Sequence, residues 1–153
     1  MKFTIQKSPT ADTRTCDWSK VSKEQLLHSS LMHKDDIAKA LGLFQAMLSA
    51  AAVRHDYDKL TEIARFHEDF ATGFAQTGWW DAHRLLNRHH LQQEDGIPAN
   101  VNLIDVLEFI ADCVMAGMAR SGSVYELKLP DELLQRAFQN TVAILKDSVT
   151  VEG

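Results

Sequence analysis

The chain has 153 residues, of which 45% are hydrophobic, and a net charge of −5 with its seven histidines counted as neutral. This composition excludes wholesale disorder and predicts one domain over residues 1–153, with 1–20 as an irregular N-terminal extension. The acidic balance makes a long nucleic acid an unfavourable partner. With no secretion signal, no run of 18 apolar residues and only two cysteines, we expect a cytoplasmic protein that does not cross a membrane.

The first predicted elements are a short strand and a pair of helices. Residues 2–6 alternate weakly between polar and apolar side chains, which favours a strand. Ser22, followed by Gln25 three residues later, resembles a capping box at the start of a helix. Gly42 interrupts the helical spacing, and a second apolar run then continues over residues 43–53.

The rest of the chain also has mostly helical periodicity. The expected elements are a helix over 61–76, a helix over 79–93, a loop over 95–100, and a helix after the cap residue Asn102 that stops at Ser121-Gly122. Residues 124–129 alternate and could pair with residues 2–6 as a ribbon. Pro130-Asp131 opens a last helix. We therefore predict an all-α fold, a compact bundle of about six helices, to which the ribbon could add one short β element.

Histidine is concentrated between residues 28 and 90, and one histidine stands beside an aspartate where an apolar helix is expected to end. Because the chain turns at a helix end, His55 and Asp56 could both reach one metal ion. Lys59 could then neutralise a phosphate oxygen. The alternative is an Asp-rich helix end in which the helix dipole favours His55.

A second polar run lies in the helix predicted over 79–93. His83, Asn87 and His90 have the spacing of one helical stripe. His89 lies about 100° around the helix from His90, so it could face a second ion or the substrate. A solvated polar face is the alternative for this run, and the two tryptophans just before it are interpreted as packing residues.

Acidic residues share one face of the helix predicted after Asn102. Asp105 and Glu108 are interpreted as solvent-facing. Asp112 has apolar neighbours, and a buried carboxylate needs a cation or hydrogen-bond donors. Earlier in the chain, residues 67–69 (His-Glu-Asp) are interpreted as a solvated helix face.

In this order, these residues resemble the HD superfamily of metal-dependent phosphohydrolases. The pattern of that superfamily is a histidine, an adjacent His-Asp and a distant helical aspartate, which correspond here to His33, His55-Asp56 and Asp112. The stretch HDYDK resembles the HDxxK form of the motif. In addition, HHLQQEDGIP (89–98) is similar to the HHExxDG signature of the cyclic-dinucleotide branch, which typically binds two metals, although the Gly-Tyr-Pro of that branch is missing.

A second resemblance is to a family of small phage and bacterial proteins with an HDxSK motif. The matching stretches are His33-Lys34, HDYDK with Asp58 in the usual serine place, WWDAHRLLNRHH and EFIADC. They cover about residues 33–116. The resemblances imply an HD-like helical domain that is metal-dependent, and a cytoplasmic location in the host if the protein is phage-encoded.

The residues and the resemblances together lead to the hypothesis of a phosphohydrolase that acts on a nucleotide or on a cyclic or signalling nucleotide. It would use one or two divalent ions, with Mn, Fe, Zn, Ni and Mg as candidates. The candidate metal ligands are His33, His55, Asp56, Asp112, His83, His89 and His90. The candidate catalytic residues are Asp56, Lys59, Asp58 and Glu62, and the candidate phosphate-binding residues are Lys59, Asn87, Arg88 and His89.

This hypothesis makes a geometric demand on the helix that precedes Asp56. In one straight helix, His33 and His55 would lie roughly 33 Å apart and could not share an ion. A reversal of the chain near Gly42 is therefore required. The alternatives are a non-catalytic module that binds a nucleotide or a host protein, and a purely structural role for the histidines. A homo-oligomer could form through the last helix.

Overall fold

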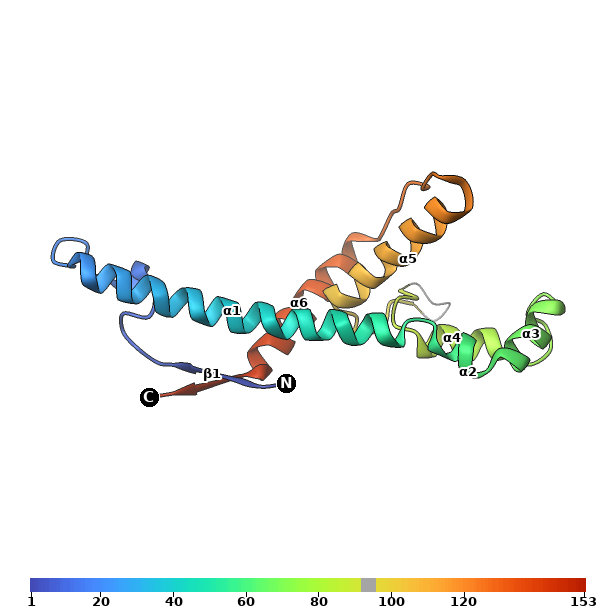
Figure 1. Ribbon diagram of the computed structural model, residues 1–153, viewed down its shortest axis with the longest axis horizontal. Helices are drawn as coiled ribbons and strands as arrows, with labels where there is room; N and C mark the ends of the chain where they lie inside the picture. Colours follow the sequence, from blue (N-terminus) through green and yellow to red (C-terminus); the bar gives the residue numbers. More distant parts are fainter. Residues whose placement is uncertain (92–95) are drawn as a thin grey trace. The chain divides into compact units, whose positions relative to one another are not determined.

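A computed structural model describes residues 1–91 and 96–153, and helices dominate it, which confirms the all-α fold class (Figure 1). The strands are β1 (Phe3–Gln6) and β2 (Val149–Glu152). The helices are the short 3-10 helix η1 (Thr13–Thr15) and the α-helices α1 (Lys23–Arg54), α2 (Tyr57–Thr61), α3 (Ile63–Ala71), α4 (Trp79–Leu86), α5 (Leu103–Ser121) and α6 (Asp131–Ser148).

The chain divides into two compact units. The first contains Met1–Ala46 and Val142–Gly153, and the second contains Met47–Thr141. The candidate residues from His55 to Asp112 all lie in the second unit, which is therefore the unit that matters for the site.

In the first unit, β1 and β2 form a two-stranded parallel sheet. Phe3 is opposite Val149 and Gln6 is opposite Glu152. The predicted ribbon between residues 2–6 and 124–129 is therefore wrong, because residues 124–129 form neither helix nor strand. The true partner is rich in β-branched residues, which favour a strand, but its four residues follow α6 so closely that they read as its continuation.

The helix α1 begins and ends where predicted, but the predicted interruption within it is absent. The Ser22 hydroxyl accepts a hydrogen bond from the backbone N–H of Gln25 (3.2 Å) and caps its first turn. The predicted reversal near Gly42 is wrong, because α1 continues through this residue to Arg54. One glycine costs a helix only about 1 kcal/mol, and the flanking leucines and alanines are strong helix formers. About 30 Å of helix therefore separates His33 from the end of α1.

One helical stretch in the described part of the chain, residues 23–61, is long and apolar enough to cross a membrane. This finding rests on length and composition alone, and it is weak by itself since core helices and signal sequences have the same properties. It qualifies the expectation of a chain without a membrane span. The cytoplasmic location stays a prediction from the sequence.

The second unit contains a hydrophobic core around the start of α5 and the first half of α6. Its buried members are Leu91, Val101, Val106, Leu133 and Ala137. As predicted, Asn102 caps α5: its side chain accepts from the N–H of Asp105, whose carboxylate accepts in return from the N–H of Asn102. The core and this cap fix the orientation of α5, which carries Glu108 and Asp112.

The region between α1 and α4 is more broken than predicted. The helix expected over 61–76 is present as the shorter α3, which α2 precedes, with Glu62 between the two in a non-helical conformation. The helix expected over 79–93 ends at Leu86, and residues 92–95, which include the start of the predicted loop, lie outside the described residues. As a result, His89 and His90 follow α4 rather than belong to it.

Asp69 joins the end of α3 to the start of α4. Its carboxylate accepts hydrogen bonds from the backbone N–H groups of Gln76 (3.2 Å), Thr77 (2.7 Å) and Trp80 (3.1 Å). These bonds, led by the one from Thr77, lower the pKa of Asp69. The prediction of a solvated face is wrong for Asp69, which is fully buried. Its role is to anchor the first turn of α4, the helix that carries His83.

Candidate metal centre

The site begins at Asp56, where the chain turns after α1. The backbone of Asp56 is in the left-handed region (φ 52°), which aspartate tolerates better than most residues. The N–H of Asp56 donates to the side-chain oxygen of Asn87 (3.2 Å), which holds the turn in place. The turn brings neighbouring side chains together, so that Nε2 of His55 lies 3.7 Å from Oδ2 of Asp56. The predicted convergence of this pair at a helix end is present in the structure.

Four side chains bring potential ligand atoms within 4.8 Å of one another: Asp56, His83, His89 and His90. We call them the His₃Asp group. Oδ1 of Asp56 lies 3.5 Å from Nε2 of His83 and 3.6 Å from Nε2 of His89. Nε2 of His90 lies 3.1 Å from Nε2 of His83. This Oδ1 is buried and has no hydrogen-bond partner, so a carboxylate oxygen and three imidazole nitrogens surround a position where a cation would satisfy them.

The spacing of these atoms matches a metal site. A tetrahedral zinc ion with ligands at about 2.0–2.1 Å keeps neighbouring ligand atoms about 3.3 Å apart. Three of the six distances between ligand atoms in the His₃Asp group, 3.1, 3.5 and 3.6 Å, lie close to this value, and all six are within 4.8 Å. The residues present therefore fit a divalent cation with little rearrangement.

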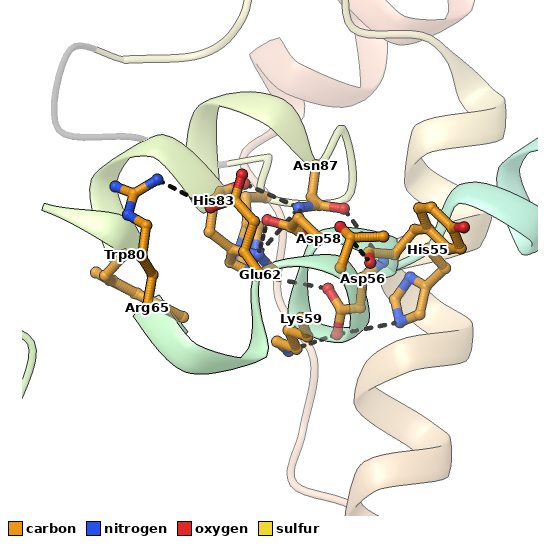
Figure 2. A network of polar contacts seen from close by, with 12 residues as sticks. His55, Asp56, Asp58, Lys59, Glu62, Arg65, Trp80, His83 and Asn87 are labelled. Atoms are coloured by element: carbon orange, nitrogen blue, oxygen red, sulfur yellow. Dashed lines mark hydrogen bonds and ion pairs between the residues drawn. The ribbon is translucent and has the colours of Figure 1, made fainter. Parts of the chain in front are cut away.

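A buried carboxylate fixes the direction of His83. Nδ1 of His83 lies 2.8 Å from Oδ2 of Asp58, so its N–H donates to this carboxylate and Nε2 keeps a free lone pair. The amide of Asn87 donates to the other oxygen of Asp58 (3.0 Å). Figure 2 shows Asp58, His83 and Asn87 joined in this way, with Asp56 beside them. The indole of Trp79 stacks on the ring of His83 at 4.8 Å and fills the space behind it.

Glu108 on α5 contacts the Nδ1 atoms of His55 and His89, as Asp58 contacts that of His83. Its Oε1 lies 3.0 Å from Nδ1 of His55 and 3.2 Å from Nδ1 of His89. Nε2 of His55 is also 3.7 Å from Oδ1 of Asp112. The ligand atoms of His55, His89 and Glu108 form a second cluster of possible metal ligands. Since the distances from Glu108 are those of hydrogen bonds, we assign Glu108 to the orientation of His55 and His89.

Burial and neighbouring charges shift the pKa values in the His₃Asp group toward the protonation states that bind a cation. Burial lowers the pKa of His89, and the nearby charge of His55 lowers it further. Burial, together with His89 and His83, lowers the pKa of His90 to about 4, so this imidazole is neutral at pH 7, as a metal ligand must be. Burial raises the pKa of Asp56, but the stronger combined effect of Lys59, His55 and His89 lowers it. Asp56 therefore stays an anion.

Other predicted site residues have structural partners. Lys59 makes an ion pair with Asp56, which places its charge next to the His₃Asp group (Figure 2). The carboxylate of Glu62 accepts from Arg65 (2.9 Å). Arg88 was predicted to bind phosphate, but its guanidinium donates two hydrogen bonds to Asp105, at 2.7 Å each. These donors are therefore already paired with a carboxylate.

His33 is an exposed residue of α1 in the first unit, and neither possible metal cluster found among the described residues contains it. The physical reason is the continuity of α1, which removes the turn that His33 needed in order to reach Asp56.

Two acidic residues were misjudged from the sequence. Asp105 and Glu108 were expected to face solvent, but Asp105 is buried against Arg88, and Glu108 is largely enclosed between His55 and His89. The spacing of Glu108 and Asp112 on one helix face, next to apolar residues, was a signal that both could face the histidines. The partnership of Asp58 with His83 had no comparable signal, because it depends on how α2 and α4 pack.

Replacing Asp58 with alanine is expected to lower the affinity for a divalent cation about 10- to 100-fold, because it frees the ring of His83 to rotate and leaves its Nδ1 without an acceptor. Titration calorimetry with Zn²⁺ measures this change. Glu62→Ala removes an exposed carboxylate from the neighbouring turn and should leave the affinity unchanged. Equal affinities for wild type and Asp58→Ala would contradict the orienting role.

No protein-family model, curated protein or solved structure matches this chain. The functional assignment therefore depends on the site itself.

Proposed function

We propose that this protein is a metal-dependent phosphohydrolase that acts on a nucleotide or another small phosphate ester. The observation that supports this most is the buried, unpaired Oδ1 of Asp56, which faces the Nε2 atoms of His83 and His89. Three imidazoles and one carboxylate suit Zn, Mn, Fe or Ni better than Mg, which prefers oxygen ligands. Such an ion supplies Lewis acidity, which withdraws charge from phosphate oxygens and makes water more acidic.

The residues around the His₃Asp group can bind the phosphate and transfer protons. Lys59, beside Asp56, offers a positive charge for a phosphate oxygen. His55 is partly exposed, Glu108 holds its Nδ1, and its Nε2 faces Asp112 at 3.7 Å, so this pair can accept or donate a proton. Asp58 and Glu62 are less suited to proton transfer, because Asp58 is buried behind His83 and Glu62 pairs with Arg65.

The test is a phosphate-release assay on 5′-nucleotides, nucleoside triphosphates and cyclic nucleotides, run separately with Zn²⁺, Mn²⁺, Fe²⁺, Ni²⁺ and Mg²⁺. We expect turnover that a chelator removes and that one of the first four ions restores. Full occupancy of the site by a metal without turnover of any substrate would contradict the proposal. It would favour the alternative, a non-catalytic module that binds a nucleotide or a protein.

A further inference from the structure

A cavity of about 520 Å³ opens beside the candidate metal centre, between the last turns of α1 and the middle of α5. Its walls are built mainly from alanine, leucine and methionine side chains. Its polar lining residues are His55, Glu108 and Asp112. The volume lies within the usual range for small-molecule sites.

The cavity adjoins the metal centre at His55. The ring of His55 lines the cavity and also lies 4.4 Å from the ring of His89, a member of the His₃Asp group. A molecule with one end at the His₃Asp group could therefore extend along His55 into the cavity.

The charges around the cavity restrict what can enter it. Its described lining includes two carboxylates and no lysine or arginine, so a phosphate group inside the cavity would be repelled. Glu108 already accepts from two histidines, and no described residue of the walls has an amide or hydroxyl side chain that could form hydrogen bonds with the edge of a nucleobase. The walls can therefore select a group by its apolar surface and size.

We propose that this cavity receives the uncharged, apolar alcohol part of a phosphate monoester whose phosphate lies at the His₃Asp group. This inference rests on the proposed function and narrows its substrate class to monoesters with an apolar alcohol. In the reaction, the oxygen of water bonds to phosphorus and the ester P–O bond breaks. A proton passes to the departing alcohol, so that ROPO₃²⁻ and H₂O give ROH and HPO₄²⁻.

The test uses n-alkyl phosphates from ethyl to octyl, because their leaving groups differ in apolar surface and hardly in reactivity. For the metal-loaded wild type, we expect kcat/KM to rise about two- to fourfold with each added methylene until the cavity is full. Hydrolysis that does not depend on chain length would overturn this inference and leave the proposed function intact. Preferred hydrolysis of nucleoside triphosphates would overturn it as well.

Filling the cavity provides the matched comparison. Ala52 and Ala111 line it from α1 and α5, and both are exposed, so Ala52→Phe and Ala111→Phe can fold normally. Each variant should reduce the octyl-to-ethyl ratio of kcat/KM at least about tenfold, while the affinity for the metal ion stays that of the wild type. Ala64→Phe on α3, outside this lining, should behave as wild type. Unchanged ratios in both filled variants would overturn the proposal.

Binding of n-alkyl phosphonates, which are not hydrolysed, separates the two levels of the proposal. Calorimetry on the metal-loaded protein should show affinity that rises with chain length and falls in Ala52→Phe. If this holds while no ester is hydrolysed, the cavity is supported and the proposed hydrolase function fails. If chain length has no effect and Ala52→Phe instead disrupts an oligomer, the cavity is an interface between copies and the inference is overturned.

Discussion

Replacing Asp56 with alanine is expected to abolish both metal binding and turnover. The substitution removes the only carboxylate of the His₃Asp group, whose Oδ1 lies 3.5 and 3.6 Å from the nitrogens of His83 and His89. It also leaves three imidazoles without a compensating negative charge. The affinity for Zn²⁺ should therefore fall by more than the roughly 10- to 100-fold typical of orienting residues. Turnover should fall about 1,000-fold or more, since a metal contributes several kcal/mol to phosphoryl transfer.

Asp81→Ala is the matched control for this experiment. Asp81 is an exposed carboxylate on α4, close in sequence to His83, and its ion pair with Arg84 lies on the surface. Surface pairs contribute little, so this variant should keep the metal affinity, the turnover and the helical content of the wild type. If Asp56→Ala hydrolyses substrate as fast as Asp81→Ala, Asp56 has no part in the chemistry.

Adding a divalent cation is expected to raise the melting temperature of the protein by roughly 5–10 °C. At a free concentration 100 times its dissociation constant, a ligand that binds only the folded state stabilises it by about 2.7 kcal/mol. The His₃Asp group exists only when α4 and the turn after α1 are folded together, so the ion should bind the folded state selectively. Differential scanning fluorimetry with Zn²⁺ or Mn²⁺ measures the shift.

Two comparisons make this measurement specific. Asp56→Ala should melt at the same temperature with and without metal, because it lacks the carboxylate ligand. Ca²⁺ should have little effect on the wild type, since it prefers oxygen ligands to imidazole. A shift of equal size in Asp56→Ala would show that the stabilising metal binds elsewhere.

Local signals in the sequence predicted the helix boundaries well where a side chain caps the backbone. Ser22 caps α1 and Asn102 caps α5, as their positions before apolar periodic runs indicated. The pairing of β1 with β2 was not predictable, because it joins residues near opposite ends of the chain. The reversal predicted at Gly42 was wrong because a glycine only permits a reversal of the chain, and tertiary contacts decide whether one occurs.

The candidate metal centre was partly predictable. The adjacency of His55 and Asp56 at a helix end pointed to residues that the structure does bring close together. His83 and His90 also lie close together, but through the turn after α4 and not through the predicted helical stripe, because α4 ends at Leu86. The carboxylates that orient the rings, Asp58 and Glu108, were not assigned this role, because a ring's partner depends on how separate helices pack. The candidate metal ligands are therefore easier to predict from the sequence than the carboxylates that orient their rings.

The most direct measurement is anomalous diffraction from crystals of the wild-type protein grown with Zn²⁺ or Mn²⁺. The account predicts one strong peak within about 2.0–2.3 Å of Asp56 and of the Nε2 atoms of His83, His89 and His90. A peak held instead by Nδ1 of His55 and His89 with Glu108 would contradict it. So would crystals that contain the metal but show these four side chains pointing apart.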